Sequence, residues 1–489
     1  MAKRVFRPYD PGQPLALPAD LRGWLPPDHL AYLVSDIVDQ LDLSPILSVY
    51  ERGDGGGSPP YHPVLLTKLL FYAYSEGVVS SRAIAAKTYS DVAFRVLACD
   101  QHPDFRTVSD FRERHLGALG ELFIEVVRLA GRLGLVKLEQ VAQDGTKVLA
   151  NASKHRAMSY ARLQEAEERL GKEVAALLEA ARAADAAEDA AYGAAATGDE
   201  LPPDLSGEVA RRERRLATIR AAKGALEAEA RAEAEAVRAA DAAERERRAA
   251  AGEPKKPGRV PDPSGEPAPG AQRNFTDPDS RIMVDADKSF VQAYNAQAAV
   301  DASPHQIIVG CGVTNQAADA PHLAPMLGRV RAATGATPRE WSADAAYFSA
   351  GNLAALGEAG IEAFIPPDRQ SHSAAPPPAP VAALLAAAGL GPPPDPEGAE
   401  AGNAAKAAMR AKLRTPGGRA AYASRKQTVE PVFGQIKEGR GLRRFLLRGL
   451  AKVDAEWTLW CLTHNLLKIA RALRALAGLR PRLALAGAG

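Results

Sequence analysis

Cysteine is scarce in this 489-residue chain, which contains only Cys99, Cys311 and Cys461. Three widely spaced cysteines provide neither a disulfide framework nor the spacing of a zinc site, and they fit a reducing cytosol. No run of about 18 apolar residues is present, so we expect no membrane span and no membrane partner. The polar, basic stretch Met1–Asp10 lacks the apolar core of a signal peptide. We therefore expect a cytoplasmic protein.

A large charge of one sign is also missing, because 61 Lys and Arg oppose 59 Asp and Glu for a net charge of +2. The average charge therefore does not demand a nucleic-acid partner. The C-terminal part differs, since from Gly434 onward eleven basic residues stand against three acids. A local basic surface can bind phosphate even in a nearly neutral chain, although a solvated helix face explains the same count.

Residues 1–135 are expected to form a helical N-terminal DNA-binding domain. Apolar residues recur at helical spacing in Pro63–Tyr74, and shorter helices are expected at Ser80–Tyr89, Asp91–Leu97 and Thr107–His115. The basic residues interleaved with them suit a helix-turn-helix-like unit: Arg82, Lys87, Arg95, Arg112 and Arg114. A plain helical bundle fits the same pattern.

Residues 155–274 are expected to be a helical hairpin insertion followed by a linker. Apolar residues there repeat every seven positions: Leu163, Leu170 and Leu177, Val209 and Leu216, and Ile219 and Leu226. This period predicts two long helices that pair as an antiparallel coiled hairpin. Pro202 and Pro203 mark its turn, and the Pro- and Gly-rich segment 252–270 is the linker.

The segments on either side of this insertion have the pattern of a β-sheet with helices. We expect strands at Leu138–Ala142, Ser289–Val300, Gln306–Val313, Arg339–Ala343 and Ile361–Ile365, and helices at Ala318–Ala333 and Arg419–Glu438. Mixed strands and helices predict an α/β or α+β domain, made of residues 136–154 and 275–450 around a central sheet. The Pro- and Ala-rich residues 368–415 are expected to be a second insertion.

The last segment, residues 451–489, is expected to be a C-terminal helix and tail. Its amphipathic stretch Trp457–Leu476 contains Trp457, Trp460, His464 and Asn465. We interpret these four as core residues rather than as base-stacking or catalytic groups.

Three separated acidic residues could form a metal site. Asp144 and Asp344 each follow an expected strand, and Glu430 lies on an expected helix. Phosphoryl transfer on DNA needs divalent cations that activate the attacking oxygen and stabilise the leaving one, and Mg²⁺ prefers carboxylate oxygens. Taken singly, Asp144 also fits a turn, Asp344 a helix cap and Glu430 an exposed helical side chain.

Six motifs together resemble the DDE transposases of bacterial insertion sequences, in the branch with a helical N-terminal domain and a helical insertion. They are Pro63–Tyr74, Thr107–Arg112, Asp144–Lys147, Tyr294–Gln297, Ala343–Phe348 and Arg425–Lys437. They cover most of the chain outside its two insertions. The resemblance implies an α/β, RNase H-like mixed sheet with flanking helices, with Asp144, Asp344 and Glu430 as catalytic metal ligands. Two Mg²⁺ ions are the implied cofactor, and Mn²⁺ can substitute.

Related transposases carry a Tyr, Arg, Glu, Lys signature with gaps of two, three and six residues. Tyr422 and Arg425 keep the first gap, and Glu430 and Lys437 keep the last. The middle gap departs from the pattern, because Lys426 and not Arg425 stands at the expected place. One residue rotates a helical side chain by about 100°, so either residue could be the phosphate contact. The expected DNA-binding residues are Tyr422, Arg425, Lys426, Lys437, Arg440, Arg443 and Arg444.

The sequence thus predicts a transposase that binds the terminal inverted repeats of its element and catalyses metal-dependent cleavage and strand transfer. Its partner is double-stranded DNA, both transposon ends and target. A homodimer in a synaptic complex is expected, with the hairpin serving that pairing. Two alternatives remain, a catalytically silent DNA-binding relic and a coiled-coil scaffold. The scaffold explains the hairpin alone, and the sequence shows no lost acid that would mark a relic.

Overall fold

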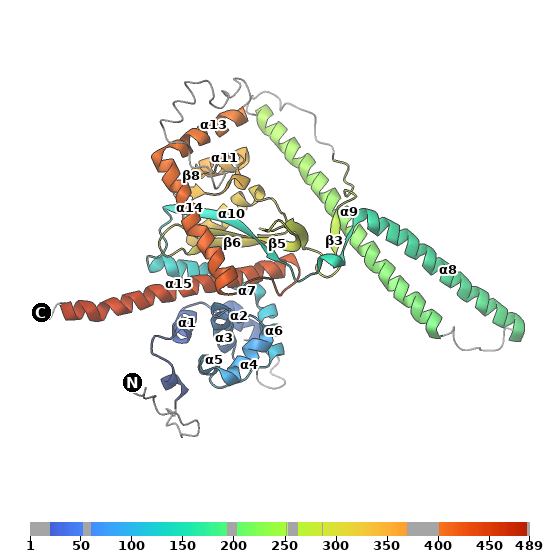
Figure 1. The fold of residues 1–489 in the computed structure, drawn as a ribbon, viewed down its shortest axis with the longest axis horizontal. Coiled ribbons are helices and arrows are strands. Elements are labelled where there is room, and N and C mark those ends of the chain that lie inside the picture. The colour runs from blue at the N-terminus through green and yellow to red at the C-terminus, as the bar shows by residue number, and fades with distance from the viewer. Residues whose placement is uncertain are drawn as a thin grey trace, which may run out of the picture.

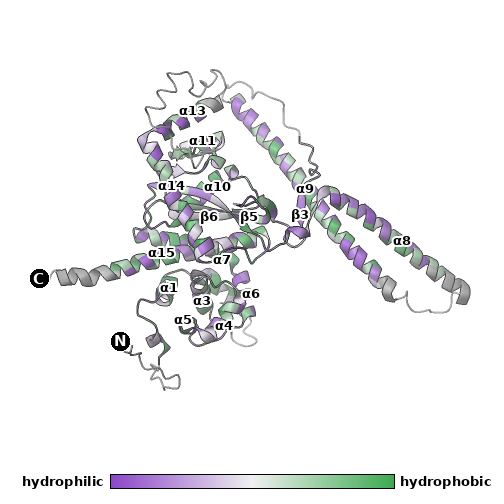
Figure 2. Cartoon of the chain, in the orientation of Figure 1, coloured by the Kyte–Doolittle hydropathy of each residue, from purple (hydrophilic) through white to green (hydrophobic). Residues whose placement is uncertain are grey.

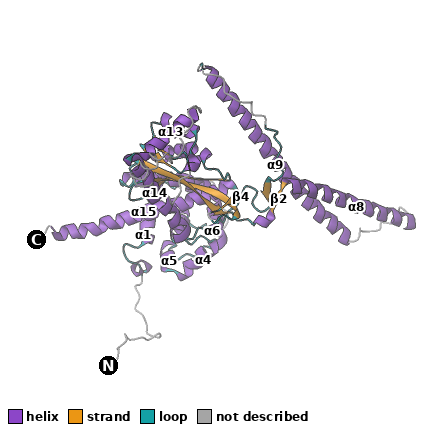
Figure 3. Ribbon diagram, turned by 45° about the horizontal axis from the view of Figure 1, so that its top comes forward, coloured by secondary structure: helices purple, strands orange, loops and turns teal. Residues whose placement is uncertain are grey.

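The computed structural model describes residues 20–51, 60–192, 203–250, 252, 263–285, 287–368 and 401–486. A central sheet is surrounded by helices, and a long helical hairpin projects to one side (Figure 1). Figure 3 shows the strands gathered in the middle of the molecule with helices around them. None of the helices described here is both long and apolar enough to cross a membrane.

The N-terminal region is helical, as predicted. After the 3-10 turn η1 (Leu21–Trp24) come α1 (Leu30–Val38), α2 (Ser44–Glu51), α3 (Pro63–Ser75), α4 (Ser81–Ser90), α5 (Val92–Leu97), α6 (Phe105–Arg114) and α7 (Leu116–Arg132). Helix α3 begins where His62 Nδ1 accepts the Val64 N–H and Pro63 takes the first helical turn. Nearly all of its side chains are buried, so it forms the centre of this helical group.

The sheet is mixed. Its strands are β1 (Gln140–Leu149), β4 (Arg281–Val284), β5 (Phe290–Asp301), β6 (Ile308–Thr314), β7 (Glu340–Ser342) and β8 (Glu362–Phe364). They are ordered β4-β5-β1-β7-β8, and β6 also pairs with β5. Strand β5 is antiparallel to β1, β4 and β6, whereas β1, β7 and β8 run parallel to one another. The parallel connections explain why β7 and β8 are reached through helices.

Helices cover this sheet. They are α10 (Leu323–Thr334), α11 (Ala350–Glu358), α13 (Ala401–Arg414), α14 (Pro416–Gly434) and α15 (Leu450–Ala486), with short turns η3 (Ala320–His322), η4 (Ala345–Tyr347) and a π-helical turn η5 (Gln435–Gly439). Helix α14 lies against β1 and β5, while α10 and α15 pack against β6. Together they form an α/β, RNase H-like fold with flanking helices, as predicted.

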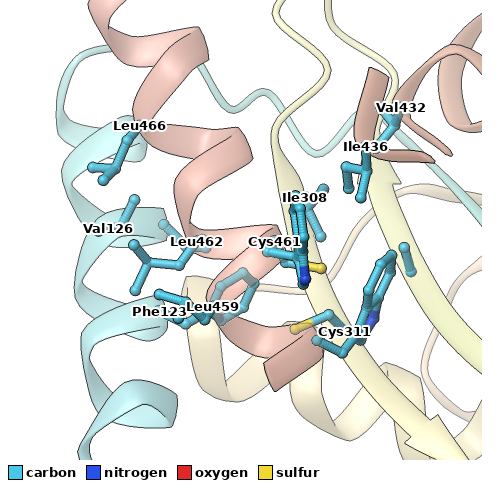
Figure 4. Packing of buried hydrophobic residues seen from close by; sticks show 14 of the residues in the cluster. Phe123, Val126, Ile308, Cys311, Val432, Ile436, Leu459, Cys461, Leu462 and Leu466 are labelled. Atoms are coloured by element: carbon cyan, nitrogen blue, oxygen red, sulfur yellow. The ribbon is translucent and has the colours of Figure 1, made fainter. Parts of the chain in front are cut away.

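One hydrophobic core runs from the N-terminal helices into the sheet. Figure 4 shows its centre, where Leu462 and Leu466 of α15 face Val126 of α7, and Cys461 of the same helix faces Cys311 of β6. Trp457 and Trp460 are also buried there, and the Asn465 side chain pairs with the backbone of Ile308. The interpretation of these α15 residues as core is therefore confirmed.

The helical hairpin is confirmed too. It leaves the sheet through η2 (Lys154–Arg156) and consists of α8 (Tyr160–Tyr192) and α9 (Pro203–Ala250), and a small ladder between β2 (Ala157–Ser159) and β3 (Gln272–Asn274) closes its base. Leu163, Leu170, Leu216, Ile219 and Leu226 form a cluster of their own, separate from the main core. Hydrophilic residues cover much of the rest of both helices (Figure 2).

Several expectations need correction. The strand expected to end near Asp144 continues to Leu149, because β1 pairs with β5 along this whole length. The strands β2, β3 and β4 were not predicted; they are only three or four residues long. Within the expected insertion 368–415, α13 is helical, whereas 369–400 lie outside the described residues, as do Pro202 and 253–262 of the linker.

Candidate active site

Asp144 lies in the middle of β1, the central strand. Successive residues of a strand point to opposite faces, and here the two faces have different neighbours. On one face Asp144 contacts Arg425 of α14, and Thr146 contacts Lys437 of η5. On the other face Gly145 has no side chain, and a Cβ there would lie 2.2 Å from Gln297 Nε2. The expected Asp-Gly turn is therefore a continuous strand.

Arg425 connects two of the three predicted catalytic acids. Its Nη1 lies 2.8 Å from Asp144 Oδ2, and its Nη2 lies 3.7 Å from Glu430 Oε1. Its side chain is only 7% exposed, against 20% for Asp144 and 51% for Glu430. The strand and the helix thus bring Asp144 and Glu430 to opposite sides of one guanidinium.

Asp344 follows β7, the parallel neighbour of β1, as predicted. It caps η4, since its Oδ1 accepts the Ala346 N–H at 2.9 Å. The interpretation of Asp344 as a helix cap is thus correct. Asp344 also interacts electrostatically with Asp144 and with Arg425, so the same side chain caps η4 and lies near Asp144.

Burial dominates the protonation of both aspartates. It raises the pKa of Asp144 to about 6, with a further upward contribution from Asp344, against the lowering effect of Arg425. The pKa of Asp344 is also raised, mainly by burial, although Arg425 and Lys147 lower it. Two partly buried carboxylates side by side disfavour each other's ionised form. The site therefore favours additional positive charge.

The structure separates the two candidates for the phosphate contact. Arg425 is buried and turned toward Asp144, whereas Lys426, the next residue, is exposed. Tyr422 lies one turn earlier on α14, with the Arg425 guanidinium 5.8 Å from its ring centre. The extra residue in the middle gap thus places the arginine, and not the lysine, beside the acids.

The remaining basic residues fall into two groups. Lys437 Nζ donates to Thr146 Oγ1 at 3.1 Å and to the Lys147 carbonyl at 3.3 Å, so it lies beside β1 near Asp144. Arg443 and Arg444 are exposed, and Arg443 pairs with Glu438. Arg440 points elsewhere: it donates to Thr463 Oγ1 and to the Trp460 carbonyl within the interior.

Pro431, directly after Glu430, lies inside α14 and has no N–H to donate to the Gln427 carbonyl. Gln306 Nε2 donates to that carbonyl instead, at 2.8 Å. The proline is thus tolerated because a side chain from the loop before β6 supplies the missing donor. This contact ties the helix that presents Glu430 to the sheet.

Sequence reasoning missed a polar network on the other face of β1. Asp319 Oδ1 accepts Asn295 Nδ2 at 2.6 Å and Gln297 Nε2 at 2.8 Å, and it lies 3.5 Å from Lys147 Nζ. The Tyr347 hydroxyl donates to Gln297 Oε1. Asn295 and Gln297 are buried. The signal was available, because the motif Tyr294–Gln297 has amides where a buried strand has apolar residues.

Four of the basic residues predicted for the N-terminal helices have partners inside the protein: Arg82, Lys87, Arg95 and Arg112. Arg112 is buried and donates to the Tyr74 hydroxyl and the Val79 carbonyl, both at 3.0 Å. Lys87 pairs with Asp91, Arg95 pairs with Asp100, and Arg82 stacks over the Phe105 ring. Arg112 therefore stabilises the packing of the N-terminal helices.

The donor chemistry of the site suits Mg²⁺, because carboxylate oxygens are its preferred ligands. The charge balance suits a cation as well, since the pKa of both aspartates is raised. Within the described part of the chain, however, no three acidic, histidine or cysteine side chains are grouped closely enough to hold a metal ion. Asp144 and Glu430 each lie beside a different terminal nitrogen of the Arg425 guanidinium.

Two family models match the chain. The model described as transposase domain (DUF772) matches residues 19–114, and the model described as transposase DDE domain matches residues 399–470. The second match includes Glu430 and Arg425 and does not reach Asp144 or Asp344. No curated protein and no solved structure matches the chain.

The fold and these two matches support a DDE transposase of an insertion sequence. Both matched segments are joined in one hydrophobic core through α15, which packs on α3 and α7 as well as on β6.

Proposed function

We propose that this transposase cleaves DNA at the ends of its element and transfers the cut strand to target DNA, with Asp144, Asp344 and Glu430 as metal ligands. The observation that carries the proposal is the contact of one guanidinium, that of Arg425, with both Asp144 and Glu430. Acids separated by 286 residues in the chain reach the same small site, where the pKa of Asp144 is raised to about 6.

Divalent ions held by these carboxylates would supply charge at the scissile phosphate and lower the pKa of the attacking water or 3′-hydroxyl. The chain's own residues orient the partners. Arg425 favours the ionised form of Asp144, because its charge opposes the effect of burial. Lys437 lies over Thr146, two residues beyond Asp144 on the same strand face, where its ammonium group can contact the DNA backbone.

Further DNA contacts follow from the same placement. Tyr422, Lys426, Arg443 and Arg444 lie on or just after the helix that carries Glu430. Residues 1–135 are proposed as the DNA-binding domain and 136–154 with 275–450 as the catalytic domain. The insertion 155–274 and the C-terminal segment 451–489 complete the division, and residues 368–415 form the second insertion.

Cleavage of an element requires both ends, so a homodimer on two DNA ends is the proposed active form. The hairpin projects from the sheet as a separately packed unit, which suits it for pairing two copies. Replacing residues 160–271 by a short linker should abolish formation of the two-ended complex and leave metal binding intact. Undiminished pairing of labelled ends in a gel assay would refute this role.

The central test is cleavage of labelled element ends with Mg²⁺ or Mn²⁺ by the wild type and by Glu430→Gln. We expect metal-dependent nicking that falls by at least about 100-fold in the variant, as expected when one of the groups that stabilise the transition state is lost. Glu358→Gln, an exposed glutamate on α11, is the matched control and should cleave normally.

Other outcomes separate the alternatives. DNA retardation without nicking by the wild type would identify a silent relic. Neither binding nor nicking would leave only a scaffold. Nicking that is equal in the wild type and in Glu430→Gln would overturn the assignment of Glu430.

A further inference from the structure

A second charged region lies away from the three acids, where α15 passes between α1 and η5. A cavity of about 350 Å³ opens there. Five basic side chains line it: Arg440, His464, Lys468, Arg471 and Arg474. The other lining residues are Leu30, Gln435, Gly439, Leu467 and Ala470, so the wall contains no carboxylate. We call it the basic cavity.

The charged side chains of the basic cavity donate hydrogen bonds to neutral acceptors. Arg440 donates to Thr463 Oγ1 at 2.8 Å and to the Trp460 carbonyl at 3.0 Å, and its buried Nε has no hydrogen-bond partner. Lys468 Nζ donates to Gln306 Oε1 at 2.9 Å, and Arg474 donates to the Asp28 carbonyl. Among the described residues none of these cations pairs with a carboxylate, unlike most of the basic residues of the hairpin.

Neighbouring cations lower the pKa of two groups in the basic cavity, Lys468 and His464. Burial and then Arg471 lower the pKa of Lys468 to about 8, and burial lowers the pKa of Arg440 to about 10. The pKa of His464 is lowered as well, first by burial and then by Arg440 and Lys468. Arg471 lowers the pKa of His464 in the same direction. A bound anion would relieve this repulsion, because opposite charges nearby favour the charged forms.

We propose that the basic cavity binds a phosphate group of the DNA backbone, through Lys468 and Arg471, with the charge of Arg440 in the same wall. Arginine and lysine around a small cavity suit phosphate because they donate charge-assisted hydrogen bonds to its oxygens. Phosphate contacts fix how a protein lies on a duplex without reading its sequence. The inference rests on the proposed function, since it assigns a second anchoring point to the DNA that the active site cleaves.

The basic cavity is linked to the active site through two elements. Gln306 accepts from Lys468 through Oε1 and donates through Nε2 to the Gln427 carbonyl, one turn before Glu430. The π-helical turn η5 presents Gln435 and Gly439 to the cavity, while Lys437 contacts β1 beside Asp144. π-helical turns often occur at functional sites. A phosphate held in the cavity would thus be positioned relative to the helix that carries Glu430.

The test measures how the DNA affinity of the full chain depends on salt. A labelled duplex that contains an element end is titrated by fluorescence anisotropy in the presence of Ca²⁺. The NaCl concentration is varied between about 50 and 300 mM, because the affinity of phosphate contacts falls steeply over this range. The double variant Lys468→Gln/Arg471→Gln should bind roughly tenfold more weakly at low salt. Its slope of log affinity against log salt should be smaller by about 1 to 2, because each phosphate contact contributes about 0.9.

The matched control is Arg169→Gln/Lys172→Gln on α8, which removes the same charge from two exposed side chains. It should keep the wild-type slope. A wild-type slope in Lys468→Gln/Arg471→Gln would overturn the inference. An equal loss of DNA affinity in the control variant would overturn it as well. Circular dichroism and thermal unfolding verify that both double variants are folded.

A second arm distinguishes DNA from free phosphate. Inorganic pyrophosphate is added to the wild type and both double variants, and the unfolding temperature is recorded. Stabilisation that depends on Lys468 and Arg471, together with an unchanged DNA slope, would mean that the cavity takes a free phosphate, which overturns the DNA assignment. If the wild type itself bound no DNA, the proposed function would fall together with the inference, whereas an altered slope with no cleavage would fail the proposed function alone.

Discussion

Arg425 Nη1 lies 2.8 Å from Asp144 Oδ2, although the two positions are 281 residues apart in the chain. The same guanidinium approaches Glu430 at 3.7 Å. A fixed cation therefore lies between two of the acids that the proposed reaction needs. It partly offsets the burial of Asp144, and any divalent ion would bind in competition with it or beside it.

The first prediction concerns the protonation of Asp144. Because Arg425 lowers the pKa of this carboxyl, Arg425→Gln should raise that pKa further above about 6. The acidic limb of the pH–rate profile for cleavage should then move to higher pH. Arg425→Lys should move it less, because the positive charge is kept. The measurement is single-turnover cleavage between pH 5 and 9. Lys426→Gln, at the adjacent exposed position, should keep the wild-type midpoint, and identical midpoints in all four proteins would contradict the argument.

The second prediction concerns metal affinity. A carboxyl with a pKa of about 6 holds a proton at pH 5, and a divalent ion must displace it. Binding of Mn²⁺ should therefore strengthen as the pH rises from 5 to 7, by up to about tenfold per pH unit below the pKa. Titration calorimetry without DNA measures this directly. Asp144→Asn should bind weakly at every pH, and a wild-type affinity that does not change with pH would argue against Asp144 as a ligand.

The third prediction concerns Gly145. A Cβ at this position would lie 2.2 Å from Gln297 Nε2 and 2.9 Å from Asp319 Oδ1. Gly145→Ala should therefore reduce the free energy of unfolding by about 1–3 kcal/mol, as overpacking does in cores. Gly120→Ala in α7, where no atom lies within 4 Å of the new Cβ, should instead stabilise by about 0.5–1 kcal/mol. Urea denaturation compares the two, and equal effects would show that the polar network can move aside.

The fourth prediction concerns the separate core of the hairpin. Ile219 is 1% exposed and belongs to the separate hydrophobic cluster of the hairpin. Ile219→Ala should cost the hairpin about 2–5 kcal/mol and open it to proteolysis, while the unfolding of the main core stays unchanged. Leu178→Ala, at a position that is 41% exposed, should have little effect. Simultaneous loss of the sheet in the Ile219 variant would mean that the two cores unfold together.

Much of the fold was accessible from the sequence because its periodicities are strong. The seven-residue spacing of Leu163 and Leu170 predicted the hairpin, and Pro63–Tyr74 predicted α3 almost to the residue. The end of β1 was wrong because the polar run after Ala142 looks like a turn. These residues form a strand because they lie beside amide side chains of β5 and beside the acids that precede η3 and η4. Those partners come from distant segments, so the local sequence does not reveal them.

The candidate site was less accessible, since it depends on contacts across hundreds of residues. Spacing alone could not decide between Arg425 and Lys426, because a helix places adjacent residues on different faces and only the packing of α14 on β1 selects one. Asp319 was missed because it follows no strand and caps no helix through its side chain. The inward direction of Arg440 was equally hidden, as nothing near it in sequence indicates the Thr463 hydroxyl and the Trp460 carbonyl that it contacts.

The hairpin begins and ends at neighbouring points of the molecule. Ser159 pairs with Gln272, and Leu149 pairs with Ala293, so the chain leaves and re-enters through adjacent strands only about 5 Å apart. The described residues between Ser159 and Gln272 contain no strand of the central sheet. A module whose two ends lie equally close together, such as a fluorescent reporter, could therefore replace the hairpin at this position without displacing the strands on either side.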